Sequence, residues 1–271
     1  MSLSLSKDAD VLGPRVDVAG VGLGHGHPFR VIAGPCSVES YEQFRLTATA
    51  VKQGGATLLR GGAYKPRTSP YSFQGLGREG LEVMRSVGDE LAMGVVTEAM
   101  APEDVELVAS LADMIQIGAR NMDNRSLLRA AAEAGKPVLL KRGFTATVDE
   151  VLMAAEYILA CGNNQVAVCE RGSRTFEPSM RNSLDIAAIP EMRLRSDLPV
   201  VVDPSHGTGR TDLVTPAALA GIAAGADALM VEVHPDPSTA LSDGYQSLEL
   251  SQFAEFMASV GAMAAAVGRS I

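Results

Sequence analysis

PVVVDPSH at residues 199–206 and ALMVEVHP at residues 228–235 are short apolar runs that each end in acidic and imidazole side chains. Continuous apolar runs of this length are typical of strands buried on both faces, as in parallel sheets. Six further runs of this kind lie earlier in the chain: FRVIAGPC (29–36), ATLLRGG (56–62), GVVTEA (94–99), DMIQIG (113–118), PVLLKRG (137–143) and QVAVCERG (165–172). The sequence therefore contains eight candidate strands.

Helical segments separate these strands. We expect helices at residues 40–53, 74–92, 102–110, 123–134, 146–160, 215–224 and 248–267. Ser40 with Gln43 three residues later resembles a capping box, and Thr147 is followed by Asp149 and Glu150, acids that suit a first helical turn. The eight alternations of strand and helix predict an α/β protein with the (β/α)8 (TIM) barrel fold, and a doubly wound open sheet is the alternative.

We expect one catalytic barrel, which spans residues 29–271. The Gly-rich segment VDVAGVGLGHGH precedes the first strand, and its alternating valines predict a β-hairpin at residues 14–28 that plugs the bottom of the barrel. Residues 1–13 are expected to form a disordered tail. We expect no appended regulatory domain, because the roughly 28 residues before the barrel are fewer than the ~40 that usually fold unaided.

Composition narrows the class of protein. The chain has 271 residues, of which 46% are hydrophobic, so it is long enough to bury a large core. A net charge of −9 argues against a nucleic-acid partner. The sequence has no run of about 18 apolar residues, so we expect no membrane-spanning helix. The odd count of 3 cysteines does not suit a disulfide framework. A cytoplasmic protein fits these observations best.

Polar side chains stand at the carboxyl ends of the predicted strands, where barrels of this kind carry their active sites. A single buried charge costs several kcal/mol unless it is paired, so a ring of them is hard to explain by packing alone. The alternative is a set of unrelated salt bridges at the barrel mouth. In strand order the residues are Cys36, Arg60, Glu98, Arg120, Lys141, Glu170, Arg171, Asp203, His206, Glu232 and His234.

Cations dominate part of this ring and suggest anionic ligands. Arginine binds phosphate oxygens through a bidentate fork, while lysine acts as a point charge. The segment KPRTSP (65–70) adds the hydroxyls of Thr68 and Ser69. The glycine-rich segment DPSHGTGR (203–210) follows the seventh strand, where barrels often hold a phosphate. The cations that could bind two phosphates and a carboxylate are Arg60, Lys65, Arg67, Arg120, Lys141 and Arg171.

A metal site is predicted from Cys36, His206, Glu232 and Asp243. The first and last strands of a closed barrel are neighbours, so these distant residues can meet. One thiolate, one imidazole and two carboxylates form a site of intermediate softness that suits Mn, Fe, Co or Zn. The alternatives are a small buried hydrophobe for Cys36 and a hydrogen-bonded core residue for His206.

Long motifs resemble a known family. AGPCSVES (33–40), LRGGAYKPRTSPYSFQGLG (59–77), TEAM (97–100), QIGARNM (116–122), LLKRG (139–143), CERG (169–172), VVDPSHGTGR (201–210) and EVHPDPSTALSDGYQSL (232–248) are similar to 3-deoxy-D-arabino-heptulosonate 7-phosphate (DAHP) synthases of the short type I-beta branch. That branch is related to the 3-deoxy-octulosonate 8-phosphate synthases. The resemblance covers about residues 14 to 260, and the motifs lie in the family's order.

The resemblance implies a transferase that condenses phosphoenolpyruvate with erythrose 4-phosphate and water. The products are DAHP and phosphate, in the first step of the shikimate pathway to chorismate and the aromatic amino acids. It implies one divalent metal ion, held by Cys36, His206, Glu232 and Asp243, and no organic cofactor. It also implies a homotetramer. Because the extension before the barrel is so short, we expect no feedback inhibition by aromatic amino acids acting on this chain alone, and a chorismate mutase is a possible regulatory partner.

The resemblance also assigns roles to individual residues. The phosphoenolpyruvate phosphate is assigned to Arg120, Lys141 and Arg171, with Ala119 beside them, and its carboxylate to Arg60 and Lys65. The aldose phosphate is assigned to the loop residues Arg67, Thr68 and Ser69. Catalytic roles fall to Lys65, Glu98, Asp203 and His206.

Three other functions remain open. An octulosonate synthase would use arabinose 5-phosphate, but such enzymes carry an asparagine where this chain has Pro66, which favours the four-carbon sugar. An inert phosphate-binding regulatory homologue should have lost metal ligands, whereas this chain keeps all four. An enzyme with the same reaction in secondary metabolism would carry the same residues.

Overall fold

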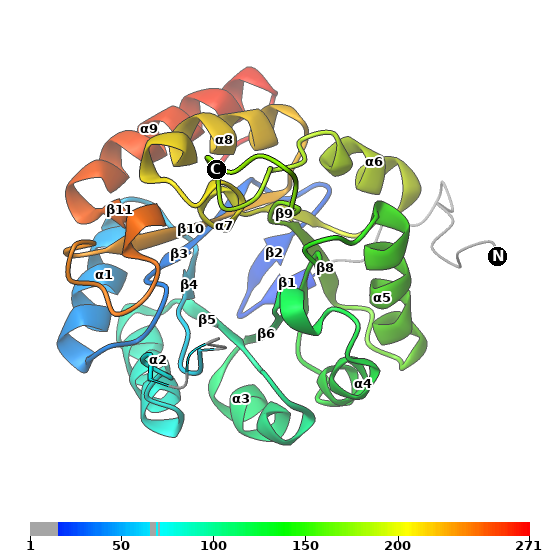
Figure 1. Cartoon of the computed structure of the whole chain (residues 1–271), viewed down its shortest axis with the longest axis horizontal. Helices are drawn as coiled ribbons and strands as arrows, with labels where there is room; N and C mark the ends of the chain where they lie inside the picture. Colours follow the sequence, from blue (N-terminus) through cyan, green and yellow to red (C-terminus); the bar gives the residue numbers. More distant parts are fainter. Residues whose placement is uncertain (1–15, 66–68, 70) are drawn as a thin grey trace.

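The computed structural model describes residues 16–65, 69 and 71–271. Eight parallel strands form a closed barrel, because the last of them pairs with both the seventh and the first (Figure 1). The strands are β3 (Arg30–Gly34), β4 (Leu58–Arg60), β5 (Gly94–Glu98), β6 (Met114–Ile117), β7 (Val138–Lys141), β8 (Val166–Glu170), β9 (Val200–Val202) and β10 (Ala228–His234). The predicted (β/α)8 barrel is confirmed, and the open sheet is excluded.

Helices surround the barrel and cover the outer face of every strand (Figure 1). The main ones are α1 (Tyr41–Gln53), α2 (Arg78–Leu91), α3 (Val105–Leu111), α4 (Arg125–Glu133), α5 (Val148–Ala160), α6 (Ala188–Arg195), α8 (Thr211–Ala223) and α9 (Leu250–Ala266). Shorter elements lie at the mouth of the barrel: η1 (Pro102–Asp104), η2 (Ala119–Asn121), α7 (Pro204–Thr208), η3 (Gly244–Gln246) and β11 (Leu248–Glu249). None of the described helices is both long and apolar enough to span a membrane.

Three helices differ from the predicted boundaries. Helix α2 begins at Arg78 rather than at residue 74, because Gly75 and Gly77 have φ angles of 96° and 60°, outside the helical region. Helix α8 begins one turn before residue 215 and contains Pro216 in its interior. Helix α6 was not predicted. Its Pro190 lies in the first turn, where a backbone donor would have no partner within the helix.

An antiparallel hairpin closes the amino-terminal end of the barrel, as predicted. Strands β1 (Val16–Val18) and β2 (Val21–Leu23) are joined by a two-residue turn at Ala19 and Gly20, whose φ angles are 52° and 84°. The hairpin valines pack into a cluster with barrel residues such as Ile32 and Met114. The hairpin is therefore visible through the ring of strands in Figure 1.

Two hydrophobic clusters explain the continuous apolar runs of the sequence. Leu58 belongs to the cluster inside the barrel, whereas its neighbour Leu59 belongs to the cluster between strands and helices. Both side chains are fully buried, as expected for a parallel sheet covered on both faces. The expected tail at residues 1–13 and the loop residues Pro66, Arg67 and Thr68 lie outside the described residues.

Candidate active site

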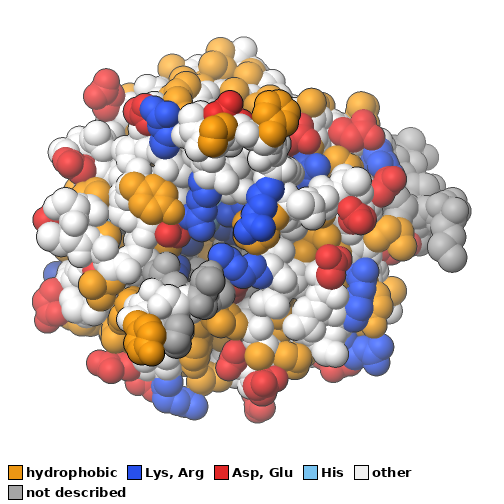
Figure 2. Space-filling model, in the orientation of Figure 1, with side chains coloured by type: hydrophobic (Ala, Val, Ile, Leu, Met, Phe, Trp, Pro, Cys, Tyr) orange, Lys and Arg blue, Asp and Glu red, His pale blue; other side chains and the backbone are white. Residues whose placement is uncertain are grey.

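A basic pocket opens at the carboxyl ends of the barrel strands. Its empty space, including the open solvent at its mouth, is ≈ 610 Å³, and Figure 2 shows Lys and Arg side chains gathered over the centre of the barrel. The chain as a whole carries a net charge of −9, so this concentration of cations marks a site for anions. The lining residues are Arg60, Lys65, Glu98, Gln116, Gly118, Ala119, Arg120, Lys141, Phe144, Arg171, Arg181, His206 and Asp243.

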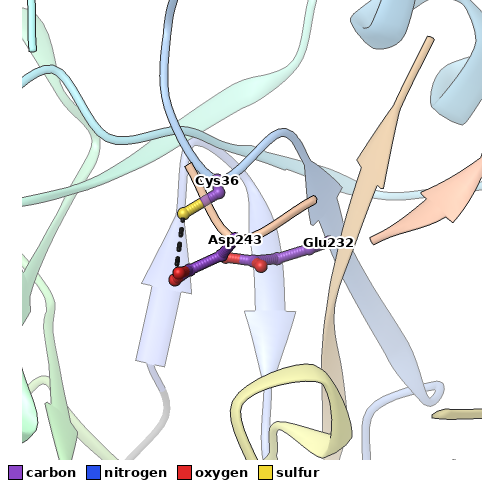
Figure 3. A group of neighbouring side chains, drawn as sticks. All are labelled: Cys36, Glu232 and Asp243. Carbon is purple, nitrogen blue, oxygen red and sulfur yellow. Dashed lines mark hydrogen bonds between the residues drawn. The ribbon is translucent and has the colours of Figure 1, made fainter. Parts of the chain in front are cut away.

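Three side chains with metal-ligating atoms meet at one edge of this pocket. Cys36, Glu232 and Asp243 place a sulfur and two carboxylate oxygens within 4.8 Å of one another (Figure 3). Cys36 follows β3, Glu232 lies within β10, and Asp243 lies in the loop after β10. Because β10 pairs with β3, barrel closure brings together residues that are about two hundred positions apart in the sequence.

His206, the fourth predicted ligand, lies beside this group but is not one of the three side chains that form it. Its Nε2 atom is 3.4 Å from Glu232 Oε1. Its Nδ1 atom is 2.8 Å from Asp203 Oδ2, in a contact too bent for a strong hydrogen bond. Burial lowers the pKa of His206 to about 4, although Asp203 opposes this shift. The imidazole is therefore neutral near pH 7 and can donate a lone pair to a metal ion.

Each of the three side chains in this group lies beside a cation. Lys65 Nζ lies 2.9 Å from Cys36 Sγ, an Arg60 nitrogen lies 2.8 Å from Glu232 Oε1, and Arg181 lies 3.0 Å from Asp243 Oδ2. Burial raises the pKa of the Cys36 thiol to about 11, and Glu232 adds to the shift. A coordinated metal would reverse this by deprotonating the thiol. The donor set of thiol, imidazole and two carboxylates fits a divalent cation of intermediate softness.

Arg171 supplies a buried positive charge to the pocket. It is 3% exposed, and its NH1 atom has no hydrogen-bond partner within the described part of the chain. Burial lowers the pKa of this guanidinium, although Asp203 opposes the shift. A buried guanidinium N–H without a hydrogen-bond partner lowers the stability of the protein unless a ligand accepts the hydrogen bond. A phosphate oxygen is a suitable acceptor.

Lys141 differs from Arg171 because it already has a counterion. Its Nζ atom lies 2.7 Å from Asp203 Oδ2. Burial opposes ionisation of Asp203, but the charge of Lys141 and a hydrogen bond of 3.0 Å from the backbone N–H of His206 favour it, and the pKa of this carboxyl lies well below its usual range. Asp203 therefore stays charged and orients both the lysine and the candidate ligand His206.

Glu98 reaches the pocket from the end of β5. Gln116 Nε2 donates a hydrogen bond of 3.1 Å to Glu98 Oε2. The other carboxylate oxygen lies over Gly118, where an added Cβ atom would be only 2.1 Å from it. The position of Glu98 thus depends on the absence of a side chain at Gly118.

Most of the predicted site residues converge. Arg60, Lys65, Glu98, Ala119, Arg120, Lys141, Arg171, His206 and Asp243 line the pocket, and Cys36, Asp203 and Glu232 lie buried in contact with lining residues. Ser69 is exposed and does not line the pocket, while Arg67 and Thr68 lie outside the described residues.

Two members of the predicted polar ring point elsewhere. Glu170 forms an ion pair of 2.7 Å with Arg142, and His234 lies 3.4 Å from Glu39. Neither side chain lines the pocket. These two residues stabilise the loops at the barrel mouth and do not contact the pocket.

Sequence reasoning missed four residues of the pocket: Gln116, Gly118, Phe144 and Arg181. Gln116 lies within a strand, and Phe144 is an isolated aromatic residue without a motif. Arg181 belongs to the long connection between β8 and α6, and the length of that loop was a signal that could have drawn attention to it.

Comparisons with known proteins agree with this geometry. The profile of the DAHP synthetase I family matches residues 6–268. Phospho-2-dehydro-3-deoxyheptonate aldolase of Thermotoga maritima is 53% identical over 253 residues, which cover 93% of this chain and 75% of the relative. A 2-dehydro-3-deoxyphosphooctonate aldolase of Acidithiobacillus ferrooxidans is 33% identical over 258 residues, which cover 89% of this chain and 91% of the relative.

Solved structures of Thermotoga maritima proteins share the fold. The crystal structure of phospho-2-dehydro-3-deoxyheptonate aldolase (DAHP synthase) superposes with a TM-score of 0.91 at 52% identity, covering 94% of this chain and 75% of that one. A truncated form of 3-deoxy-D-arabino-heptulosonate 7-phosphate synthase superposes with a TM-score of 0.92 at 46% identity, covering 100% of this chain and 99% of that one.

Proposed function

Because this chain belongs to the DAHP synthetase I family, we propose that its basic pocket condenses phosphoenolpyruvate with erythrose 4-phosphate and water, giving DAHP and phosphate in the first step of the shikimate pathway. The observation that carries the proposal is the pairing of two features in one cavity. Cations without a counterion, above all Arg171, line the same pocket that borders the group formed by Cys36, Glu232 and Asp243.

Phosphoenolpyruvate binds through its two anionic groups. Arg171, Arg120 and Lys141 bind the phosphate, while Arg60 and Lys65 face the carboxylate from the metal side of the pocket. Arg171 supports this assignment because its NH1 atom is buried without a partner among the described residues. The remaining anion-binding residues Arg67, Thr68 and Ser69 are proposed for the phosphate of the aldose, with the backbone at Ala119 beside the first phosphate.

Cys36, His206, Glu232 and Asp243 are the residues that would hold a divalent Mn, Fe, Co or Zn ion. Such an ion supplies a Lewis acid that polarises an aldehyde oxygen. Their fit to this role rests on the mixed donor set and on the neutral imidazole of His206. No organic cofactor is needed for this chemistry.

The reaction forms one carbon–carbon bond and one carbon–oxygen bond, and breaks the carbon–oxygen bond to the phosphate ester. The methylene carbon of phosphoenolpyruvate attacks the aldehyde carbon, whose oxygen takes a proton from Lys65. Water then adds at the carbon that bears the phosphate ester, and Glu98 accepts its proton. Phosphate leaves with the bridging oxygen and takes up the remaining proton of the added hydroxyl as the ketone forms, and Arg171 and Lys141 stabilise its charge. Asp203 keeps Lys141 and His206 in position throughout.

The substrate sugar can be tested by direct competition. We expect kcat/KM with erythrose 4-phosphate to exceed that with arabinose 5-phosphate by at least roughly tenfold, because Pro66 offers no side-chain donor for the extra hydroxyl of the longer sugar. Phosphate release with each aldose is the measurement. Equal values would favour the activity named for the Acidithiobacillus relative instead.

Gly118→Ala should lower kcat by roughly 10²-fold, because the new methyl group would displace the Glu98 carboxylate that serves as a proton acceptor. The double variant Gly118→Ala with Glu98→Asp should recover part of this loss, since the shorter side chain leaves room for the methyl group. Gly261→Ala is the control: its new methyl group would meet only Ile271, at 3.8 Å, and kcat should not change. An unaltered kcat in Gly118→Ala would contradict the assigned position and role of Glu98.

We further propose that the protein works in the cytoplasm as a homo-oligomer, with a homotetramer as the expected form and a chorismate mutase as a possible partner. The family resemblance supports this assembly, and the Ala-rich surface of α9 offers small side chains for close packing between subunits.

A further inference from the structure

Phe144 lies at the centre of an unusual concentration of positive charge. The guanidinium carbons of Arg120, Arg171 and Arg174 lie 5.3, 4.8 and 4.7 Å from the centroid of its ring. Phe144 follows β7, while the arginines follow the neighbouring strands β6 and β8. Three loops of the barrel mouth therefore meet at one aromatic ring.

These three arginines lack the counterions that other cations of the site possess. Lys141 is paired with Asp203, and Arg181 is paired with Asp243. Across residues 16–65, 69 and 71–271, no carboxylate lies within ion-pair distance of Arg120, Arg171 or Arg174. An aromatic ring thus occupies the place where a carboxylate would otherwise be expected.

An aromatic ring and a carboxylate affect an arginine differently. The negative face of the ring attracts the guanidinium but does not neutralise it. A carboxylate would both occupy the N–H donors and compete with an incoming phosphate. Phe144 can therefore hold three mutually repelling cations while their hydrogen-bond donors stay free, as the unpartnered NH1 atom of Arg171 illustrates.

The backbone fixes this arrangement as well. Arg174 N donates a hydrogen bond of 2.7 Å to Phe144 O, which ties the loop after β8 to the loop after β7. Phe144 itself lines the pocket together with Arg120 and Arg171. The ring thus has a defined position between the two arginines assigned to the phosphate of phosphoenolpyruvate.

We propose that Phe144 is a positioning residue whose π face preorganises Arg120 and Arg171 for the phosphate of phosphoenolpyruvate. This inference rests on the proposed function, because it takes that phosphate as the ligand of the two arginines. The role depends on the electrons of the ring rather than on its volume. It predicts an effect on phosphate binding that is larger than the effect on turnover.

Replacement of Phe144 by a graded series of fluorinated phenylalanines tests this role, since fluorine withdraws the negative charge of the ring face and changes its size little. The dissociation constants of phosphoenolpyruvate and of inorganic phosphate are measured by calorimetry. We expect both dissociation constants to rise stepwise with the number of fluorines. The rise should reach roughly 5- to 30-fold, because two cation–π contacts are lost. Phe144→Leu should show a similar loss, with KM for phosphoenolpyruvate raised far more than kcat is lowered, and Phe144→Trp should retain affinity.

The control is Phe176→Leu, because Phe176 is 99% exposed on the β8–α6 loop, which also carries Arg171 and Arg174, and has no arginine over its ring among the described residues. Its affinity for phosphoenolpyruvate should match that of the unaltered protein. A flat response to fluorination, in a protein that binds phosphoenolpyruvate, would overturn the role of Phe144 and leave the proposed function intact. Failure of the unaltered protein to bind phosphoenolpyruvate would overturn both.

Discussion

Removal of divalent metal from the purified protein is expected to abolish turnover, and addition of Mn, Fe, Co or Zn should restore it. The physical reason is the arrangement of Cys36, Glu232 and Asp243 within 4.8 Å of one another, beside a neutral His206. Without an ion, nothing at this edge of the pocket polarises the aldehyde oxygen as strongly. Phosphate release before chelation, after chelation and after metal addition is the measurement.

Cys36→Ser should weaken the binding of Zn or Fe, because the thiolate is the softest of the four ligands. The loss should exceed the roughly 10- to 100-fold that accompanies removal of an outer-shell partner of a metal site. Competition with a chromophoric chelator measures this affinity without any assay of activity. Cys161→Ser is the matched control, since Cys161 lies at the end of helix α5. Full activity in thoroughly demetallated protein would contradict the metal site.

Arg171→Ala is expected to lower kcat/KM for phosphoenolpyruvate by on the order of 10²- to 10³-fold, since loss of one member of a buried charge contact costs about 2–5 kcal/mol. Arg171 is 3% exposed and has an unpartnered NH1 atom within the described residues, so a bound phosphate is its natural counterion. Steady-state kinetics with varied phosphoenolpyruvate is the measurement.

The fold of this variant should survive, because Arg171 has no ion pair to lose in the described part of the chain. A thermal melt checks this point. Arg45→Ala is the control for a change of one charge, because Arg45 pairs with Glu90 on the outer surface of the barrel. Normal kinetics in Arg171→Ala would show that the arginine does not contact phosphate.

The barrel was predictable because its signal is repeated eight times. Each strand is buried on both faces, so it is a continuous apolar run. A run such as PVVVDPSH can therefore be recognised as a strand from its own sequence. Boundaries were less predictable. The start of α2 depends on the backbone angles of Gly75 and Gly77. The start of α8 depends on whether the helix can include Pro216 in its interior, which it does.

The positions of site residues were predictable where those residues lie at the carboxyl ends of strands. Arg60, Glu98 and Lys141 each occupy the last position of a strand, so barrel geometry directs all three to the mouth. Arg181 and Phe144 lie in loops, and their places depend on contacts made only after folding. Conversely, Glu170 also ends a strand, but its ion pair with Arg142 keeps it out of the pocket.

The central claim is the condensation of two phosphorylated substrates in one pocket. Its most direct test incubates the metal-loaded protein with phosphoenolpyruvate, with and without erythrose 4-phosphate, and measures phosphate release and consumption of phosphoenolpyruvate together. The account predicts that one phosphate appears for each phosphoenolpyruvate consumed, that one seven-carbon product forms, and that none of this occurs without the aldose. Phosphate release that is independent of the aldose, or no consumption of phosphoenolpyruvate at all, would contradict it.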